Sequence, residues 1–176
     1  NSQKYVAMGT GLYEASGADF AGVKTDFANA ITDLDVLDNV LWIATGSGNV
    51  SWTMDTSENF TSQTGIFAQL FHTFDGYLYR ANANDLYYYD GSTWSAALEV
   101  GDDTTNITGL TGLNKTLLIA KSDGLYGFTS GPWTYNIVRW ESQYDANNGT
   151  GMCEWNGAVY IPVQYGLVKY DGSVFV

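Results

Sequence analysis

The sequence is short of several residue types, and each shortage narrows the possibilities. Cys153 is the only cysteine, so no disulfide can form within the chain. Seven basic residues stand against 19 acidic ones, and a formal net charge of -12 repels both a phosphate backbone and an anionic membrane surface. No run of residues approaches the roughly 20 apolar positions of a membrane-spanning helix. The composition therefore predicts neither nucleic acid as a partner nor insertion into a membrane.

What the chain has in abundance is a repeated β pattern. A strand-like run, a small polar turn and a closing aromatic occur five times, and in four copies the second residue of the run and the aromatic lie eight positions apart. These copies run from Gly11 to Phe20, Asp85 to Trp94, Gly124 to Trp133 and Gly166 to Phe175, and a copy two residues longer runs from Asn49 to Phe60. A β-patterned repeat of roughly 40 residues is typical of a β-propeller.

A second motif recurs in phase with the first. An apolar run ends at a short polar turn, and a further run follows that begins at Leu41, Leu78, Leu117 or Val159, at spacings of 37, 39 and 42 residues. The turns are Asp38-Asn39, Asp75-Gly76, Asn114-Lys115 and Asn156-Gly157. Asp-Gly and Asn-Gly between apolar runs favour a type I′ hairpin turn. Each repeat therefore predicts four short antiparallel strands, which is one propeller blade.

The strand count predicts an all-β propeller domain over residues 1–176 with about 4.5 blades. Its repeats cover approximately 1–29, 30–65, 66–105, 106–149 and 150–176. The second and third strands occur five times, but the first occurs four times and the last fourth strand stops at Val176. Two interpretations follow: a five-blade ring without its closing strand, or part of a ring of six to eight blades. The second is favoured, because an open ring exposes unpaired strand edges.

The turns before the closing aromatics resemble known propeller motifs. The segment Thr53 to Phe60 resembles a degenerate Asp-box, and Asp90-Gly91-Ser92-Thr93-Trp94 and Asp171-Gly172-Ser173-Val174-Phe175 are similar to turns of kelch-like and regulator-type propeller repeats. In those families the turn is structural, so the resemblance implies a fold rather than an activity. Sialidases share the Asp-box and hold the substrate carboxylate with three arginines. This chain contains only Arg80 and Arg139, so we predict that it is not an enzyme.

The amino-acid sequence of the repeats also resembles propeller segments of tailed-bacteriophage structural proteins, especially tail and nozzle components. Asp75-Gly76-Tyr77-Leu78-Tyr79 is an example. This resemblance implies a virion protein, either structural or concerned with host recognition. Its partners would be other virion proteins or a glycan or protein of the host surface, and a homo-oligomer is possible. Two alternatives stay open: an extracellular lectin-like propeller, and a fragment of a glycoside hydrolase.

Four chemically distinctive residues fall at one repeat position. Asp35, His72, Thr111 and Cys153 each lie three residues before a hairpin turn, on strands that line the central channel of a propeller. Together they could offer a metal site or a nucleophile. Packing between blades is the favoured interpretation, because there is no second histidine and no metal-ligand spacing. No cofactor is predicted.

Two connections between repeats carry the candidate binding residues. They are Asp102 and Asp103 in the first, and Arg139, Trp140 and Tyr144 in the second. Arg, Trp and Tyr are enriched at interface hot spots, and the alternative is a solvated loop with a half-buried tryptophan. Calcium at the aspartate pair would need six or more oxygen ligands, and two neighbours do not supply them.

Aromatic residues and glycosylation triplets are weaker signals. Tyr87-Tyr88-Tyr89 is compatible with carbohydrate stacking, but alternation along a strand favours packing within the blade. Asn49, Asn59, Asn106, Asn114 and Asn148 lie in Asn-x-Ser/Thr triplets, which can carry glycans in a eukaryotic secreted protein. Asn and Thr are also common in β-turns.

Overall fold

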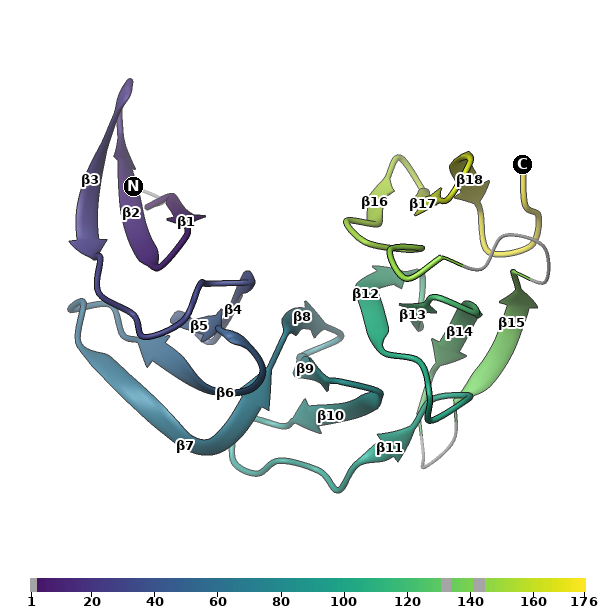
Figure 1. Ribbon diagram of the computed structural model, residues 1–176, viewed down its shortest axis with the longest axis horizontal. Helices are drawn as coiled ribbons and strands as arrows, with labels where there is room; N and C mark the ends of the chain where they lie inside the picture. Colours follow the sequence, from purple (N-terminus) through teal and green to yellow (C-terminus); the bar gives the residue numbers. More distant parts are fainter. Residues whose placement is uncertain (1–2, 131–133, 141–144) are drawn as a thin grey trace. The chain divides into compact units, whose positions relative to one another are not determined.

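The computed structural model describes residues 3–130, 134–140 and 145–176. Strands joined by turns make up its regular structure, and Figure 1 shows them as five separate sheets. The chain divides into two compact units, Asn1–Phe71 and His72–Val176, with the division inside β8 (Leu70–Phe74). Among the described residues there is no helix long and apolar enough to span a membrane. That the repeats belong to one domain stays a prediction.

The first unit contains a three-stranded and a four-stranded antiparallel sheet. They are formed by β1 (Tyr5–Met8), β2 (Gly11–Ser16) and β3 (Asp19–Lys24), and by β4 (Asp33–Leu37), β5 (Val40–Ala44), β6 (Gly46–Met54) and β7 (Phe60–Ala68). Leu12 of the first sheet and Ile43 of the second are fully buried in one hydrophobic cluster, with Phe27 from the connection between the sheets. The ring of Phe27 meets Trp52 edge-on at 5.7 Å between centroids. Burial between sheets is therefore what holds this unit together.

The second unit contains three sheets. They are formed by β8 with β9 (Tyr77–Asn82), β10 (Asp85–Tyr89) and β11 (Leu98–Glu99); by β12 (Ile107–Leu113), β13 (Thr116–Lys121), β14 (Gly124–Phe128) and β15 (Tyr135–Arg139); and by β16 (Cys153–Trp155), β17 (Ala158–Val163) and β18 (Gly166–Tyr170). Leu118 and Leu125 lie in one buried cluster with Val159 and Ile161 of the last sheet. The predicted strand counts are confirmed: in the part of the chain that the structure describes, the sheet of β1–β3 has no first strand and the sheet of β16–β18 has no regular fourth.

The predicted hairpin turns are confirmed by their backbone angles. Both central residues have positive φ in three of them: Asp38 and Asn39 at 51° and 62°, Asp75 and Gly76 at 50° and 82°, and Asn156 and Gly157 at 53° and 77°. Asn114 of the fourth turn has φ 55°. Asn, Asp and Gly tolerate this left-handed region, which explains their recurrence between the first and second strands.

Aspartates hold the turns between the third and fourth strands. The carboxylate of Asp90 accepts hydrogen bonds from the backbone N–H groups of Ser92 and Thr93, at 2.8 and 2.7 Å. Asp55 and Asp171 accept similar bonds within their own turns. Hydrogen bonds from Thr93 and Ser92 lower the pKa of Asp90 to about 2. These motifs are therefore structural here, as the resemblance implied.

The repeat pattern also predicts that each closing aromatic opens the fourth strand of its blade, and this is wrong for two repeats. Phe20 lies in β3 and Phe60 begins β7, but Trp94 and Phe175 form only isolated bridges, and Trp133 lies outside the described residues. After Trp94 the Ser95 hydroxyl accepts the Tyr88 N–H at 3.0 Å, while the Ser95 N–H bonds to the Tyr88 carbonyl. A side chain thus replaces a ladder carbonyl, and the regular fourth strand starts later, at Leu98.

Asp33 in the first unit predicts a pH dependence of stability. Burial raises the pKa of its carboxyl to about 6, although the N–H groups of Phe71 and Leu34 both bond to it at 2.9 Å. The native state therefore binds more protons than the unfolded chain between about pH 4 and 6. The free energy of unfolding should fall as pH rises through that window, by about 1 to 3 kcal/mol from this group.

The matched variant is Asp33→Asn, which keeps an acceptor oxygen and removes the titration. Urea unfolding at a series of pH values measures both proteins. The wild type should gain stability over Asp33→Asn as pH falls from 7 to 4, and parallel curves would contradict the assignment. The turn aspartates act at lower pH: because the pKa of Asp90 is lowered, its contribution is lost only below about pH 4.

Candidate functional site: an aromatic cleft

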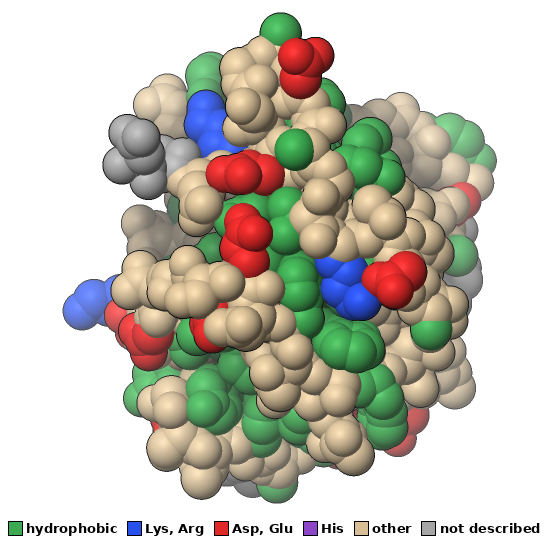
Figure 2. Space-filling model, turned by 90° about the vertical axis from the view of Figure 1, so that its left-hand side faces the viewer, with side chains coloured by type: hydrophobic (Ala, Val, Ile, Leu, Met, Phe, Trp, Pro, Cys, Tyr) green, Lys and Arg blue, Asp and Glu red, His purple; other side chains and the backbone are tan. Residues whose placement is uncertain are grey.

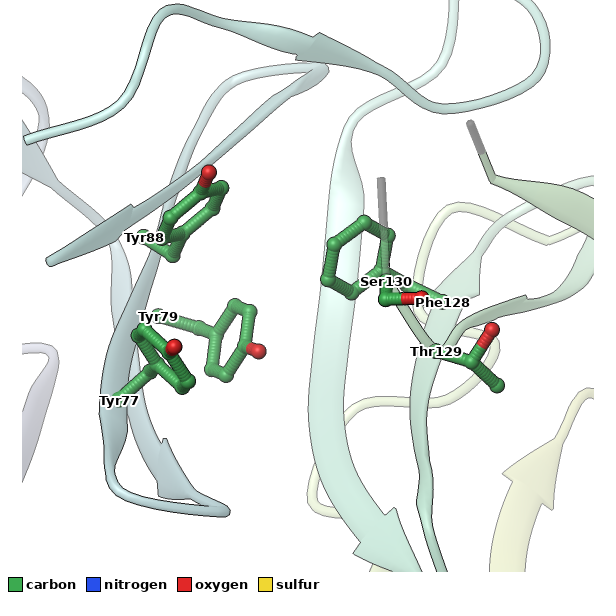
Figure 3. A pocket seen from close by; sticks show the side chains of 6 residues that line it. All are labelled: Tyr77, Tyr79, Tyr88, Phe128, Thr129 and Ser130. Carbon is green, nitrogen blue, oxygen red and sulfur yellow. The ribbon is translucent and has the colours of Figure 1, made fainter. Parts of the chain in front are cut away.

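An aromatic cleft of about 130 Å³ opens between two sheets of the second unit. It is lined by Tyr77, Tyr79, Tyr88, Phe128, Thr129 and Ser130. Figure 3 shows the three tyrosines, carried by β9 and β10, on one side, and on the other Phe128, the last residue of β14, with Thr129 and Ser130 after it. The cleft is therefore built where two successive repeats meet.

The rings in this cleft contact one another in a continuous set. The ring centroid of Tyr88 lies 5.7 Å from Tyr77, 6.2 Å from Tyr79 and 6.4 Å from Phe128. Tyr77 and Tyr88 meet edge-on, whereas Tyr88 and Phe128 are stacked with an interplanar angle of 29°. These separations are in the range in which aromatic pairs attract each other, so the walls of the cleft are preorganised.

Strand alternation and hairpin register explain the gathering of these rings. Tyr77 and Tyr79 are two apart on β9 and share a face, and Tyr79 is paired directly with Tyr88 on β10. At the matching positions of the next repeat the pair is Leu118 with Gly127, and Thr116 replaces Tyr77. The periodic scaffold places the cleft, and the tyrosines of one repeat give it its aromatic character.

The cleft offers ring faces and neutral hydroxyl groups. Tyr77 is 40% exposed and Tyr79 only 5%, so one ring faces solvent while another forms the floor. Burial raises the pKa of Tyr79 to about 12, which keeps its phenol protonated and able to donate a hydrogen bond at neutral pH. Among the described residues that line the cleft there is no Lys, Arg, Asp or Glu. Such a surface suits a neutral ligand with both an apolar face and hydroxyl groups.

Clefts of other composition occur at the same repeat position in each unit. One of about 100 Å³ is lined by Leu113, Asn114, Thr116, Leu118, Tyr135, Tyr170 and Gly172. One of about 330 Å³ in the first unit is lined by Gln3, Tyr5, Val36, Asn39, Leu41, Met54, Asp55 and Thr56. Of the three, the cleft at Tyr77 has the most aromatic wall, and this marks it as the candidate binding site.

The predicted loop residue Asp102 is influenced electrostatically by Arg139, another predicted loop residue. Hydrogen bonds from Thr104 lower the pKa of Asp102, and the charges of Lys121 and Arg139 lower it further. Asp103 and Arg139 are exposed, and Tyr144 lies outside the described residues. A binding role for these residues stays a prediction.

Lys121 is a buried charged residue that was not predicted from the sequence. Its side chain is completely buried, and Nζ donates to the carbonyl oxygens of Val100 and Asp102, the latter at 2.5 Å. Burial lowers the pKa of its ammonium group. Lys121 thus ties the loop before β12 to the end of β13. The carbonyl oxygen of Asp102 that it bonds belongs to the loop for which calcium binding was considered from the sequence. Its only sequence signal is a charge at the end of an apolar strand.

Trp140 lies inside the core rather than on a binding surface. It is 9% exposed, packs in the cluster with Leu118 and Ile161, and meets Phe175 edge-on at 6.3 Å between centroids. Its buried indole N–H has no hydrogen-bond partner among the residues that the structure describes. This burial is closer to the predicted alternative, a half-buried tryptophan in a solvated loop, than to the prediction of an exposed interface residue.

The four candidate channel residues share a register position but differ in environment. Asp35, Thr111 and Cys153 are paired with Trp42, Leu118 and Tyr160, the matching residues of their hairpins. Thr111 is buried, Cys153 is exposed, and Asp35 and His72 are intermediate. Within the described ranges, no three His, Cys, Asp or Glu residues are placed to hold a metal ion. A channel site therefore remains a hypothesis.

The guanidinium group of Arg80 packs against aromatic rings. Its guanidinium carbon lies 3.8 Å from the ring centroid of Tyr87 and 4.9 Å from that of Trp94, and the residue is 6% exposed. A cation held between two aromatic rings is a structural element of the repeat. On β10, Tyr87 and Tyr88 point to opposite faces, and of the tyrosine triplet only Tyr88 lines the aromatic cleft.

Asn148 cannot carry a glycan in the folded protein. It is 1% exposed, its amide nitrogen donates to the Ser122 carbonyl at 3.1 Å, and its amide oxygen accepts the Gln164 N–H at 2.9 Å. Asn106 and Asn114 are exposed. The Asn148 triplet therefore serves to pin the connection between the last two sheets.

Acidic groups are dispersed over the surface. On the face shown in Figure 2, Asp and Glu side chains are spread among hydrophobic and uncharged ones, with few basic side chains between them. Lys24 and Asp26 form an ion pair at 2.6 Å. A dispersed negative charge favours solubility over a focused electrostatic site.

Comparison with known proteins shows the fold alone. No family model and no curated protein matches the chain. The extracellular domain of a B. thetaiotaomicron protein aligns with a TM-score of 0.74 at 14% identity, over 99% of this chain and 25% of that one. YCF48 bound to a D1 peptide aligns with a TM-score of 0.73 at 13% identity, over 98% of this chain and 61% of that one.

The WD40 β-propeller domain of Doa1 aligns with a TM-score of 0.70 at 8% identity, over 98% of this chain and 63% of that one. This chain therefore spans between a quarter and under two thirds of the length of these structures. Identities this low leave activity open. The sheets and the likenesses together show that the chain has a β-propeller fold.

Proposed function

We propose that this chain is a non-catalytic recognition module that binds a neutral saccharide ring in the aromatic cleft. The observation that carries the proposal is the gathering of Tyr77, Tyr79, Tyr88 and Phe128 around one small opening. A cleft of about 130 Å³ is below the size of a pocket for a drug-sized ligand, and it suits one ring of a larger molecule.

The chemistry of the cleft favours a neutral sugar over a charged one. A sugar presents an apolar face that can lie on an aromatic ring, and hydroxyl groups that exchange hydrogen bonds with phenols, Thr129 and Ser130. An anionic sugar would enter a protein of net charge -12 without a lining arginine or lysine to pair with it.

We further propose that the module belongs to a virus particle, as a structural or host-recognition component, where the ligand would be a host-surface glycan. Support comes from the resemblance of the repeat sequences to propeller segments of phage structural proteins. One of the similar structures is an extracellular domain, which agrees with a location outside the cell. Detection of the chain in purified particles by mass spectrometry tests the location separately from the binding.

The alternative is an extracellular lectin-like propeller outside a virion. The aromatic cleft favours this alternative equally, because the binding chemistry is the same. A glycoside hydrolase is less well supported, since the described lining of the cleft contains no acidic residue and glycoside cleavage generally needs a pair of carboxyl groups. Turnover of a glycoside by the purified chain would reverse that order.

Tyr77→Thr is expected to weaken saccharide binding about tenfold, because the loss of one stacking ring costs about 1.4 kcal/mol. Threonine is the residue that the next repeat has at this position, and Tyr77 is 40% exposed, so the fold should tolerate the change. A glycan array selects the best neutral ligand, and calorimetric titration measures its affinity for each variant.

Two controls make the result specific. Tyr77→Phe keeps the ring and should retain most of the affinity, and Tyr165→Ala removes a 77% exposed tyrosine outside the cleft and should change nothing. The proposed site is wrong if Tyr77→Thr binds as well as the wild type. Absence of any neutral saccharide ligand would overturn the proposed function itself.

A further inference from the structure

The sequence contains two Asn-Gly dipeptides, Asn148-Gly149 and Asn156-Gly157. In such a dipeptide the backbone nitrogen of the glycine can attack the side-chain amide carbon of the asparagine, because glycine has no Cβ to hinder the approach. The structure places the two dipeptides in opposite environments. The first is buried in the connection between the last two sheets, and the second forms the hairpin turn between β16 and β17, which are labelled in Figure 1.

Asn148-Gly149 is held in a geometry that prevents the attack. The amide nitrogen of Asn148 donates to the Ser122 carbonyl, and its amide oxygen accepts the Gln164 N–H. The Gly149 nitrogen, which would have to attack, donates its proton to the Pro162 carbonyl oxygen at 2.7 Å. Neither reacting group can move without breaking hydrogen bonds in a buried place, so the fold protects this dipeptide.

Asn156-Gly157 is open to solvent. Both residues are exposed, and no heavy atom beyond the neighbouring residues lies within 4 Å of the place that a Cβ on Gly157 would take. The Gly157 N–H donates to Oε1 of Glu154 at 2.7 Å, and Glu154 is itself exposed. The attacking nitrogen is therefore restrained by one surface side chain rather than by buried backbone.

The exposure of this turn is a property of the repeat. The equivalent turns Asp38-Asn39, Asp75-Gly76 and Asn114-Lys115 are also exposed, although each belongs to a sheet that another sheet follows along the chain. Asn114 has the same turn position as Asn156, but the next residue is a lysine, whose side chain hinders the attack. Asn114, Asn148 and Asn156 together therefore separate the effect of the next residue from the effect of the fold.

We propose that Asn156 is a site of spontaneous deamidation and that Glu154 slows the reaction. The Gly157 nitrogen loses its proton to solvent and bonds to Cγ of Asn156, while the side-chain nitrogen takes up a proton and leaves as ammonia. The product is a five-membered succinimide ring. Water then opens the ring at one of its two carbonyl carbons and gives aspartate or isoaspartate. The turn gains a negative charge beside Glu154, and isoaspartate also adds a methylene group to its backbone.

Peptide mapping by mass spectrometry tests the proposal on the purified chain, incubated at mildly alkaline pH. Deamidation is followed at each asparagine by the small gain in mass when an amide becomes a carboxyl group. In the folded protein Asn156 should convert at least about tenfold faster than Asn148, a difference in barrier of about 1.4 kcal/mol. In urea the two should convert at similar rates, because both precede glycine, and Asn114 should stay slow in both states.

The succinimide also predicts two products. Peptides with aspartate and with isoaspartate at position 156 have equal mass and are separated by chromatography. Both should appear, because water can open the ring on either side. Formation of aspartate alone would indicate direct hydrolysis of the side-chain amide and would overturn the attack by the Gly157 nitrogen.

Two variants test the roles of the neighbours. Glu154→Gln keeps an acceptor oxygen but removes the charge, and it should speed the conversion of Asn156 several-fold, because a hydrogen bond to a carboxylate favours the protonated nitrogen. An unchanged rate would overturn the role of Glu154. Gly157→Lys copies the turn at Asn114 and should slow Asn156 to the rate of Asn114. Circular dichroism checks that both variants fold.

Two results would overturn the proposed site itself. One is equal rates at Asn148 and Asn156 in the folded protein, which would mean that the fold does not distinguish them. The other is conversion of Asn156 only after unfolding, which would mean that the turn protects it. Neither result bears on saccharide binding, because the aromatic cleft shares no residue with this turn.

Discussion

Trp140→Ala is expected to lower the free energy of unfolding by about 3 to 5 kcal/mol, the usual cost of deleting a buried tryptophan. The indole packs among Leu118, Ile161 and Phe175, and its removal leaves a cavity between the last two sheets of the second unit. Urea unfolding followed by fluorescence and circular dichroism measures the loss. If two-state behaviour holds, the midpoint should shift while the slope stays unchanged.

Two neighbouring variants separate packing from surface chemistry. Trp140→Phe keeps most of the buried ring and removes an indole N–H that has no partner among the described residues, so it should cost only about 1 kcal/mol. Arg139→Ala changes the exposed residue beside it and should be nearly neutral for stability. If Trp140→Ala lowered the free energy of unfolding only slightly, the indole would not be packed as described. A loss of ligand binding in Trp140→Ala would, without a stability measurement, be mistaken for loss of a contact.

Lys121→Ala is expected to destabilise the protein by about 3 kcal/mol. The change removes a fully buried side chain and leaves two carbonyl oxygens, of Val100 and Asp102, without their donor. The loop from Val100 to Asp102 should also loosen, because its attachment to β13 is lost. Hydrogen exchange should therefore increase at Asp102 and in the residues that follow it up to β12.

Lys121→Met separates the two causes. Methionine fills a similar volume but donates no hydrogen bond, so the cavity is avoided and about 1 to 3 kcal/mol should remain from the unsatisfied carbonyls. If Lys121→Met were as stable as the wild type, the hydrogen bonds to the loop would contribute nothing. If instead both variants lost the same amount, the cavity would be irrelevant and the polar contacts would account for the whole effect.

The architecture was predictable because each of its signals is local and repeated. Alternating apolar residues set the strands, and Asp-Gly and Asn-Gly pairs set the hairpins through positive φ, as at Asp75 and Gly76. The aspartate turns were likewise visible, because Asp90 bonds to residues two and three positions away. The error at Trp94 came from one residue, Ser95, whose hydroxyl competes with the backbone ladder.

The candidate site was not predictable to the same degree. Tyr88 was assigned to packing, and Tyr77 and Phe128 were not singled out, since they come from two repeats and meet only when two sheets pack. The pairing of Tyr79 with Tyr88 was accessible from the hairpin register. Trp140 looked like a loop residue because its position follows the last strand of a sheet, and the direction of its side chain is a property of packing alone.

By itself the sequence determined the repeat, the five sheets and the strand missing from the first of them, because strand period and turn residues act over a few positions. Tertiary structure decided which side chains of one repeat meet those of the next. It placed Lys121 and Trp140 inside, opened the cleft at Tyr77, and buried Asn148 while leaving Asn156 exposed. The reason is that burial and contact depend on the neighbouring sheet, which the local pattern of a single repeat does not contain.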